Sequence, residues 1–190
     1  MANIDAADFE ARWRRWYAGT PPLGFLLREA HPDRWLRIHS LPGGKRCADT
    51  PAERAGLLLR HNAALSAVVR GEDALLLGYD HDGADRPPAG HPLARWLADA
   101  PKVMALPPGD DVAALTTVFA LHLAWRPGIL DDALLQVAED HTRLMVVNAV
   151  TGATYAPYDG GADLFWPTRA DRDAASARFA AWHPPGPLHL

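Results

Sequence analysis

The stretch from residue 143 to residue 166, RLMVVNAVTGATYAPYDGGADLFW, contains three short apolar runs separated by two tight turns. The first run is rich in valine, and Thr151-Gly152 then predicts a hairpin into a second strand. Asp159-Gly160-Gly161 predicts another turn, which leads into a third strand. Strands joined by such short turns run antiparallel, so this stretch predicts a three-strand meander in a largely antiparallel sheet.

Outward from the meander, the chain alternates between strand and helix patterns. Apolar residues that recur at helical spacing, together with capping residues, predict helices at 5–17, 50–69, 93–100 and 129–140, and a last helix that begins at Thr168. Strands are predicted at 35–39, 74–79, 115–125, 143–150, 153–157 and 164–166, and 23–30 fits either a helical turn or an extended segment. The sequence therefore predicts the α+β class, with helices packed on the sheet and the meander followed by a C-terminal helix.

The length of the chain, 190 residues, suits a single domain that spans residues 1–190. Two parts of it depart from regular patterns. Residues 80–111 are rich in proline and glycine and are expected to form an irregular section, and 184–190 is expected to be a frayed tail.

Composition excludes several classes of function. The formal net charge of −4 gives no general attraction to nucleic acid or to an anionic membrane. The N-terminus lacks the apolar core of a signal peptide, and no apolar run is long enough to span a bilayer. Cys47 is the sole cysteine, which excludes an internal disulfide and fits a reducing compartment. We therefore expect a cytoplasmic protein.

The most cationic segment is 34–50, RWLRIHSLPGGKRCADT, which leaves a predicted strand and enters a helix that begins with the capping box Thr50-Pro51-Ala52-Glu53. Gly44-Lys45 resembles the end of a P-loop, but the pattern lacks its first glycine and has arginine in place of the metal-binding Ser or Thr. The segment can instead hold a carboxylate or phosphate, and its candidate residues are Arg37, His39, Ser40, Lys45 and Arg46. The alternative is a solvated turn whose charges pair with Asp49 or Glu53.

Other reactive patterns are incomplete. Cys47 with His39 or His61 could form a nucleophile and its base, although a lone cysteine is more often a small apolar residue. The acidic segment 80–85 fails the calcium-loop pattern because its glycine comes too early and no glutamate follows. The histidines show no spacing typical of a metal site. We predict no catalytic residues, no metal and no cofactor.

A second polar cluster lies around the Gly160-Gly161 turn, where Tyr158, Asp159 and Asp163 are gathered. Asp159 is expected either to cap its own turn or, with Asp163, to meet the cationic segment across the edge of the sheet. The second arrangement would give a paired polar site with aromatic walls.

Three blocks in order, RWLRIHSLPGGKRCADTPAE, Arg60-His61-Asn62 and TGATYAPYDGGAD, resemble an uncharacterised bacterial family, a domain of unknown function. That family carries an R-[FI]-H-S-L-P-x-S-K-R-Y block, an R-H-N block and a P-Y-D-G-G-x-D block. Here Gly44 and Cys47 stand where the family has Ser and Tyr, which argues against either position as a nucleophile. The resemblance adds His61 and Asn62 to the candidate residues and implies a cytoplasmic protein, in some cases an immunity protein.

These observations favour a non-enzymatic binding protein, with an immunity-type inhibitor of a neighbour-encoded toxin as the first hypothesis. The alternative is a small-molecule-binding protein or an enzyme that grips an anionic ligand through a cluster of histidine, arginine and lysine. We expect a protein partner, with a small anionic ligand as the other option, and neither nucleic acid nor membrane.

Overall fold

The computed structural model describes residues 4–71, 73–109 and 112–184. Within them lie the helices α1 (Ala6–Tyr17), α2 (Gly24–Ala30), α3 (Pro51–Val69), α4 (Ala94–Leu97), α5 (Asp131–Ala138) and α6 (Arg169–Arg178). The strands are β1 (Trp35–His39), β2 (Ala74–Asp80), β3 (Lys102–Leu106), β4 (Thr116–Leu123), β5 (Leu144–Asn148), β6 (Thr154–Tyr158) and β7 (Gly161–Phe165). Short 3₁₀ turns cover Pro32–Arg34, Pro42–Gly44 and Ala180–Trp182.

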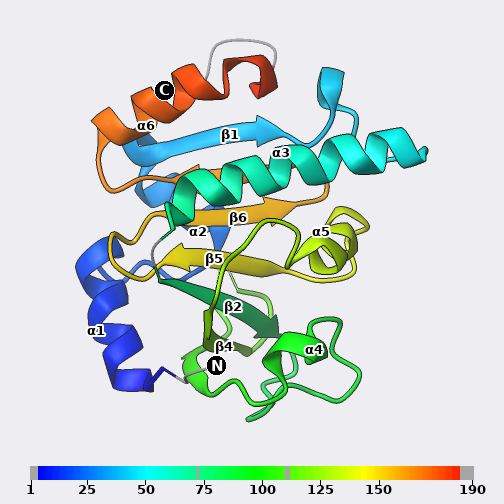
Figure 1. The fold of residues 1–190 in the computed structure, drawn as a ribbon. Coiled ribbons are helices and arrows are strands. Elements are labelled where there is room, and N and C mark those ends of the chain that lie inside the picture. The colour runs from blue at the N-terminus through cyan, green and yellow to red at the C-terminus, as the bar shows by residue number, and fades with distance from the viewer. Residues whose placement is uncertain (1–3, 72, 110–111, 185–190) are drawn as a thin grey trace.

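The seven strands form one antiparallel sheet in the order β1-β7-β6-β5-β2-β4-β3 (Figure 1). The predicted meander is present, because β5, β6 and β7 follow one another in the chain and lie side by side in the sheet. The predicted α+β class and the antiparallel sheet with packed helices are thus confirmed.

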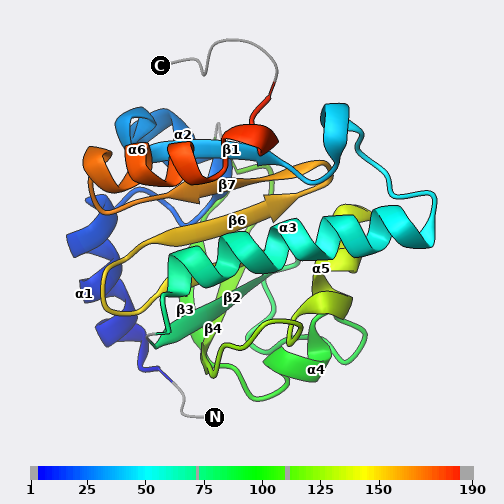
Figure 2. The same cartoon turned by 45° about the horizontal axis from the view of Figure 1, so that its top comes forward.

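Helices cover both faces of the sheet, and each face has its own apolar core. The helices α3 to α6 pack on one face, which we call the α3 face (Figure 2). The helices α1 and α2 pack on the other, the α2 face, where Phe9, Trp13 and Tyr17 of α1 are fully buried. Successive residues of a strand point to opposite faces, and this alternation divides the apolar residues of β2, β4 and β5 between the two cores.

Local capping signals place the longest helix as the sequence predicts. Thr50 accepts a hydrogen bond from the backbone N–H of Glu53, and Glu53 Oε2 accepts one from the backbone N–H of Thr50. This reciprocal pair satisfies N–H groups that have no partner within the helix. The helix ends at Val69, and Arg70 takes the left-handed conformation there. None of the helices in the described ranges is both long and apolar enough to cross a membrane.

Three local predictions need correction or completion. Residues 24–30, which fit two conformations, form the helix α2. The third strand of the meander begins at Gly161 and not at 164. The section 80–111 contains the helix α4 and also the edge strand β3, which the proline- and glycine-rich composition did not predict. Positions 110–111 of that section and 185–190 of the predicted frayed tail lie outside the described residues.

Candidate functional site

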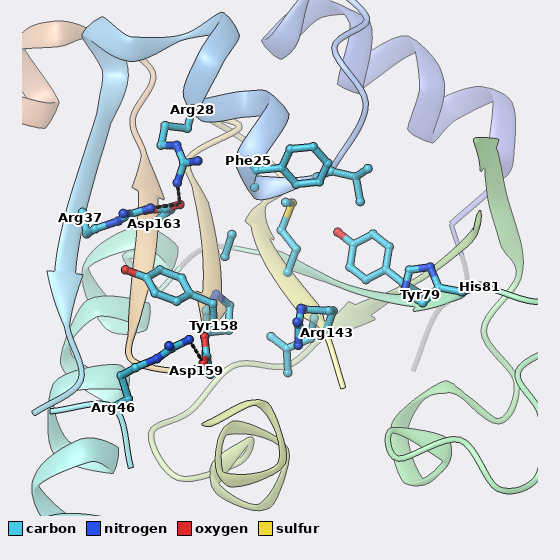
Figure 3. Close-up of a pocket in the computed structure, with 16 residues that line it drawn as sticks. Phe25, Arg28, Arg37, Arg46, Tyr79, His81, Arg143, Tyr158, Asp159 and Asp163 are labelled. Atoms are coloured by element: carbon cyan, nitrogen blue, oxygen red, sulfur yellow. Dashed lines mark hydrogen bonds and ion pairs between the residues drawn. The ribbon is translucent and has the colours of Figure 1, made fainter. Parts of the chain in front are cut away.

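A pocket of about 590 Å³ opens on the α2 face, between α2 and the strands β5, β6 and β7 (Figure 3). Its lining combines charged, aromatic and apolar side chains from elements far apart in the sequence. The lining residues are Leu23, Gly24, Phe25, Arg28, Arg37, Arg46, Tyr79, His81, Arg143, Leu144, Met145, Ala156, Pro157, Tyr158, Asp159 and Asp163.

Strand alternation decides which polar residues reach this pocket. On β1, Leu36 and Ile38 point into the core of the α3 face, so Arg37 points to the α2 face. On β7, Asp163 lies directly opposite Arg37 in the register of the two strands. The antiparallel pairing of β1 with β7 therefore places a cation and an anion side by side on the pocket face.

Asp163 is the centre of one wall of the pocket and is itself buried, with 4% of its surface exposed. It accepts hydrogen bonds from Arg37 at 2.9 and 3.2 Å and from the indole N–H of Trp35 at 2.8 Å. The guanidinium of Arg28 lies 3.7 Å from the same carboxylate. Burial lowers the pKa of Arg37, but the hydrogen bonds and the charge of Asp163 outweigh it and raise that pKa. Arg37 therefore carries its positive charge at physiological pH.

Arg37 is also held between two aromatic rings. Its guanidinium carbon lies 5.1 Å from the ring centroid of Trp35 and 5.1 Å from that of Tyr158. Burial and the neighbouring carboxylates raise the pKa of Tyr158 to about 12, although nearby arginines oppose this. The Tyr158 hydroxyl thus remains protonated, and Arg37 is fixed by both charge and stacking.

Arg46 and Asp159 form the lower end of the same wall in Figure 3. Their side chains make an ion pair that joins the β1–α3 loop to the β6–β7 turn. Gly160, with φ at +150°, allows this close approach, because an added Cβ would lie 3.3 Å from Arg46 Cγ. The backbone N–H of Ser40 also donates to the carbonyl of Gly160 at 2.9 Å. Asp159 therefore meets the cationic loop, as one of the two sequence-based alternatives proposed.

The opposite wall comes from β2 and from the residue before β5. Tyr79 donates a hydrogen bond from its hydroxyl to the carbonyl of Pro22 at 2.7 Å, which ties β2 to the start of α2. His81 Nδ1 lies 3.0 Å from the hydroxyl of Thr116. Arg143 forms an ion pair with Asp140, which is outside the lining.

The helix α2 closes the pocket from above. Gly24 at its start lies so close to β6 that an added Cβ would be 3.2 Å from Ala156 Cβ. Phe25 follows it and remains 41% exposed at the mouth of the pocket. The result is a cavity with apolar surfaces on α2 and on β5 and β6, and arginines around its edge.

The structure brings five of the predicted residues to this pocket, namely Arg37, Arg46, Tyr158, Asp159 and Asp163. The other five lie elsewhere. His39 is half-buried under Gly44, and its pKa is lowered by partial burial and by the charges of Arg37 and Arg60. Lys45 forms ion pairs with Asp49 at 2.8 Å and Glu53 at 2.5 Å, the arrangement expected of a solvated turn.

Ser40, His61 and Tyr155 form a sealed polar network on the α3 face. Ser40 Oγ lies 2.7 Å from His61 Nε2, and the Tyr155 hydroxyl is hydrogen-bonded to His61 Nδ1. The three residues are 1%, 3% and 0% exposed. Burial and the charge of Arg60 lower the pKa of His61 to about 4, so the ring is neutral at pH 7. This dyad of serine and histidine lies beneath α3, where no substrate can reach it, and its role is structural.

Asn62 also has a structural role. Its amide donates to the carbonyl of Leu58 and to Asp131, and its side-chain oxygen accepts from the backbone N–H of Gly128. It therefore fastens α3 to the start of α5. Cys47, the potential nucleophile of the sequence analysis, is exposed.

Sequence reasoning missed Phe25, Arg28, Tyr79, His81 and Arg143. The segment 23–30 carried no resolved pattern, so the side of α2 that faces the sheet could not be assigned. Tyr79 and Arg143 fell at the ends of predicted strands, and the sequence did not indicate which face of those strands would carry a pocket. Among the described residues, no group of three histidine, cysteine or acidic side chains could hold a metal ion.

The fold and pocket define an α+β domain with a basic cavity on one face of an antiparallel sheet. Residues 23–185 match the family described as Domain of unknown function (DUF3885), and the chain belongs to that family. The resemblance to an uncharacterised family is thereby confirmed. No curated protein and no solved structure matches the chain.

Proposed function

We propose that this protein binds a small molecule with an anionic group in the pocket beneath α2. The observation that carries the proposal is the charge of the lining. Four arginines and two aspartates line the cavity, a surplus of two positive charges, in a chain whose formal net charge is −4. A basic cavity in an acidic protein concentrates anions at that site.

The size and the walls of the cavity support the same function. Small-molecule sites have volumes of roughly 300–1,000 Å³ and mostly apolar linings with a few placed polar groups. The pocket, at about 590 Å³, lies in this range and joins apolar surfaces to a guanidinium-rich edge. Guanidinium groups bind carboxylates and phosphates through paired N–H donors.

The lining favours binding over covalent catalysis. The described residues that form it include no serine, threonine, cysteine or lysine. Both aspartates are engaged with arginines, at Arg37–Asp163 and Arg46–Asp159. These ion pairs hold the wall in place and leave no carboxylate ready to act as a base. We infer a non-enzymatic binding protein, and its single exposed thiol fits the bacterial cytoplasm.

Titration of a panel of nucleotides, phosphorylated metabolites and organic acids, followed by thermal unfolding, tests the proposal. A ligand present at 100 times its dissociation constant stabilises the folded state by about 2.7 kcal/mol. The double variant Arg46→Gln/Arg143→Gln removes two of the four positive charges that line the cavity, so it should weaken the binding of an anion by lowering the positive potential of the site. The matched double variant Arg14→Gln/Arg54→Gln removes the same charge outside the pocket and should bind normally. A flat response across the panel would reject the proposal.

A protein partner, of the immunity type, is the second candidate function. Its support is that Phe25 and Arg46, which line different ends of the pocket (Figure 3), are 41% and 71% exposed, since aromatic and arginine residues dominate binding hot spots. A pull-down with the product of the adjacent gene tests it. Capture by the intact protein and loss of capture by Phe25→Ala would favour this candidate over a small ligand.

A further inference from the structure

We propose that the ligand of this pocket is an amphipathic carboxylic acid, with its carboxylate on Arg28 and its apolar body between Phe25 and the strands β5 and β6. This inference rests on the proposed function and names the chemistry of the ligand. It follows from which arginine keeps its donors available and from what surrounds it.

Arg28 differs from the neighbouring Arg37 in how it is held. Arg37 gives two hydrogen bonds to Asp163 and is stacked between two rings. Arg28 lies 3.7 Å from Asp163 and 5.7 Å from the ring of Trp35, and donates no hydrogen bond within the described part of the chain. Its side chain is 33% exposed. Arg28 therefore presents a positioned guanidinium with its N–H donors available to a ligand.

The other two arginines at the edge are already engaged. Arg46 is paired with Asp159, and Arg143 is paired with Asp140 and donates to the carbonyl of Thr142. One available guanidinium matches one planar carboxylate, which it can bind through two parallel N–H donors. A phosphoryl group carries more charge and is held best by several convergent donors, whereas the other three arginines of the lining are already paired with carboxylates.

An apolar body is required because the cavity is far larger than a carboxylate group. A water molecule takes about 30 Å³ of liquid, and a free oxyanion fills only a few such volumes. The rest of the space lies against Phe25 on α2 and Met145, Ala156 and Pro157 on the strands. Phe25 is 41% exposed, whereas Met145 is almost completely buried. An apolar group in this slot would cover Phe25 and the floor together.

Calorimetric titration with a graded series of probes tests the inference. The probes are acetate, benzoate and naphthoate, the neutral naphthamide, naphthyl phosphate and inorganic phosphate. We expect naphthoate to bind about tenfold more tightly than benzoate, from the additional apolar area that it buries. We expect naphthamide to bind at least about tenfold more weakly than naphthoate, because it cannot pair with a guanidinium.

Two variants assign these differences to residues. Arg28→Gln should make naphthoate and naphthamide bind equally, and Phe25→Ala should reduce the advantage of naphthoate over acetate. Arg54→Gln and Leu59→Ala on α3 are the matched controls, since both residues are exposed on the opposite face, and they should change nothing. Circular dichroism of each variant verifies that the fold is retained.

The outcomes separate the two proposals. Tighter binding of inorganic phosphate or naphthyl phosphate than of naphthoate would overturn the carboxylate assignment and leave the anion-binding function standing. Equal affinity of naphthoate in the wild type and in Phe25→Ala would overturn the placement of the apolar body. Equal binding of naphthamide and naphthoate to the wild type would overturn the carboxylate assignment, and failure of every anion to bind would overturn both proposals.

Discussion

Two polar clusters, one on each face of the sheet, are arranged in opposite ways. On the α2 face, charged groups pair with charged groups around a cavity, as Arg37 does with Asp163 and Arg46 with Asp159. On the α3 face, the neutral residues Ser40, His61 and Tyr155 hydrogen-bond to one another without access to solvent. The first arrangement leaves donors and space for a ligand, whereas the second uses up its donors and acceptors.

The difference shows that the position of a polar residue on its strand, and not its type, decides whether it lines the pocket or belongs to the buried network. Arg37 and Ser40 are three residues apart in sequence, and they serve opposite faces because side chains alternate along an extended chain. A serine beside a histidine indicates catalysis only where a substrate can reach it. Three predictions test this separation between the pocket and the buried network.

The largest effect is expected from His61→Ala. The substitution opens a cavity and leaves the buried hydroxyls of Ser40 and Tyr155 without their shared partner. Large-to-small core substitutions and orphaned buried polar groups together should lower the free energy of unfolding by about 4 kcal/mol. Urea denaturation measures this loss. Ligand affinity at low temperature, where the variant is still folded, should equal that of the wild type.

A change in ligand affinity that exceeds the change expected from the unfolded fraction would contradict the separation. Asn62→Ala is a useful companion, since it also weakens α3 but leaves the network intact. If both variants changed the ligand affinity by the same factor, packing on the α3 face would have to influence the geometry of the pocket.

Asp163→Asn should have the next largest effect on stability. Unlike His61→Ala, it should also change the affinity for the ligand. Removal of the charge leaves the half-buried Arg37 without its anion and releases Arg28 from its neighbour. Breaking one partner of a buried ion pair costs about 3–5 kcal/mol, and the partial exposure of Arg37 reduces this to about 3 kcal/mol. Denaturation and ligand titration on the same variant should therefore both change. Normal ligand affinity in Asp163→Asn would show that this wall does not position the site.

The sequence predicts local elements well where a short-range signal exists. The capping box at Thr50 marks the start of α3, and the glycine turns of the meander set the order of β5, β6 and β7. The edge strand β3 was missed because its residues follow a proline-rich stretch, and its pairing with β4 depends on long-range contacts. Helix α2 has no capping hydrogen bond from a side chain, so its sequence carries no boundary signal.

Only five of the ten predicted site residues line the pocket, because local sequence signals do not show how distant elements pack. Eight of the predicted residues were chosen for their polar character in a cluster, and His61 and Asn62 came from the family resemblance. Neither criterion distinguishes the two faces of a sheet. Arg37 lies within β1 and Ser40 follows it, and the alternation of side chains along the chain directs the two to opposite faces. Which face carries the pocket depends on where α2 packs. The contribution of Arg28 depends wholly on that packing.

The smallest expected effect is a pH dependence that belongs to the buried network. The pKa of His61 is lowered from 6.5 to about 4 by burial and by Arg60, so the unfolded chain binds a proton that the folded chain does not. The stability that His61 contributes is therefore complete above pH 6.5 and is lost as the pH falls toward 4. From pH 7 to about pH 5 the loss should be about 2 kcal/mol.

Urea denaturation across this range, compared between the wild type and His61→Gln, isolates the contribution of this ring. The variant cannot titrate at position 61, so its stability should fall less steeply with decreasing pH. Asn62→Ala serves as the control, since it weakens the attachment of α3 but keeps His61, and it should therefore keep the wild-type slope. Parallel curves for the wild type and His61→Gln would mean that His61 is not held neutral in the folded state. The network of Ser40, His61 and Tyr155 would then be open to solvent. The contrast between an accessible pocket and a sealed network would be wrong.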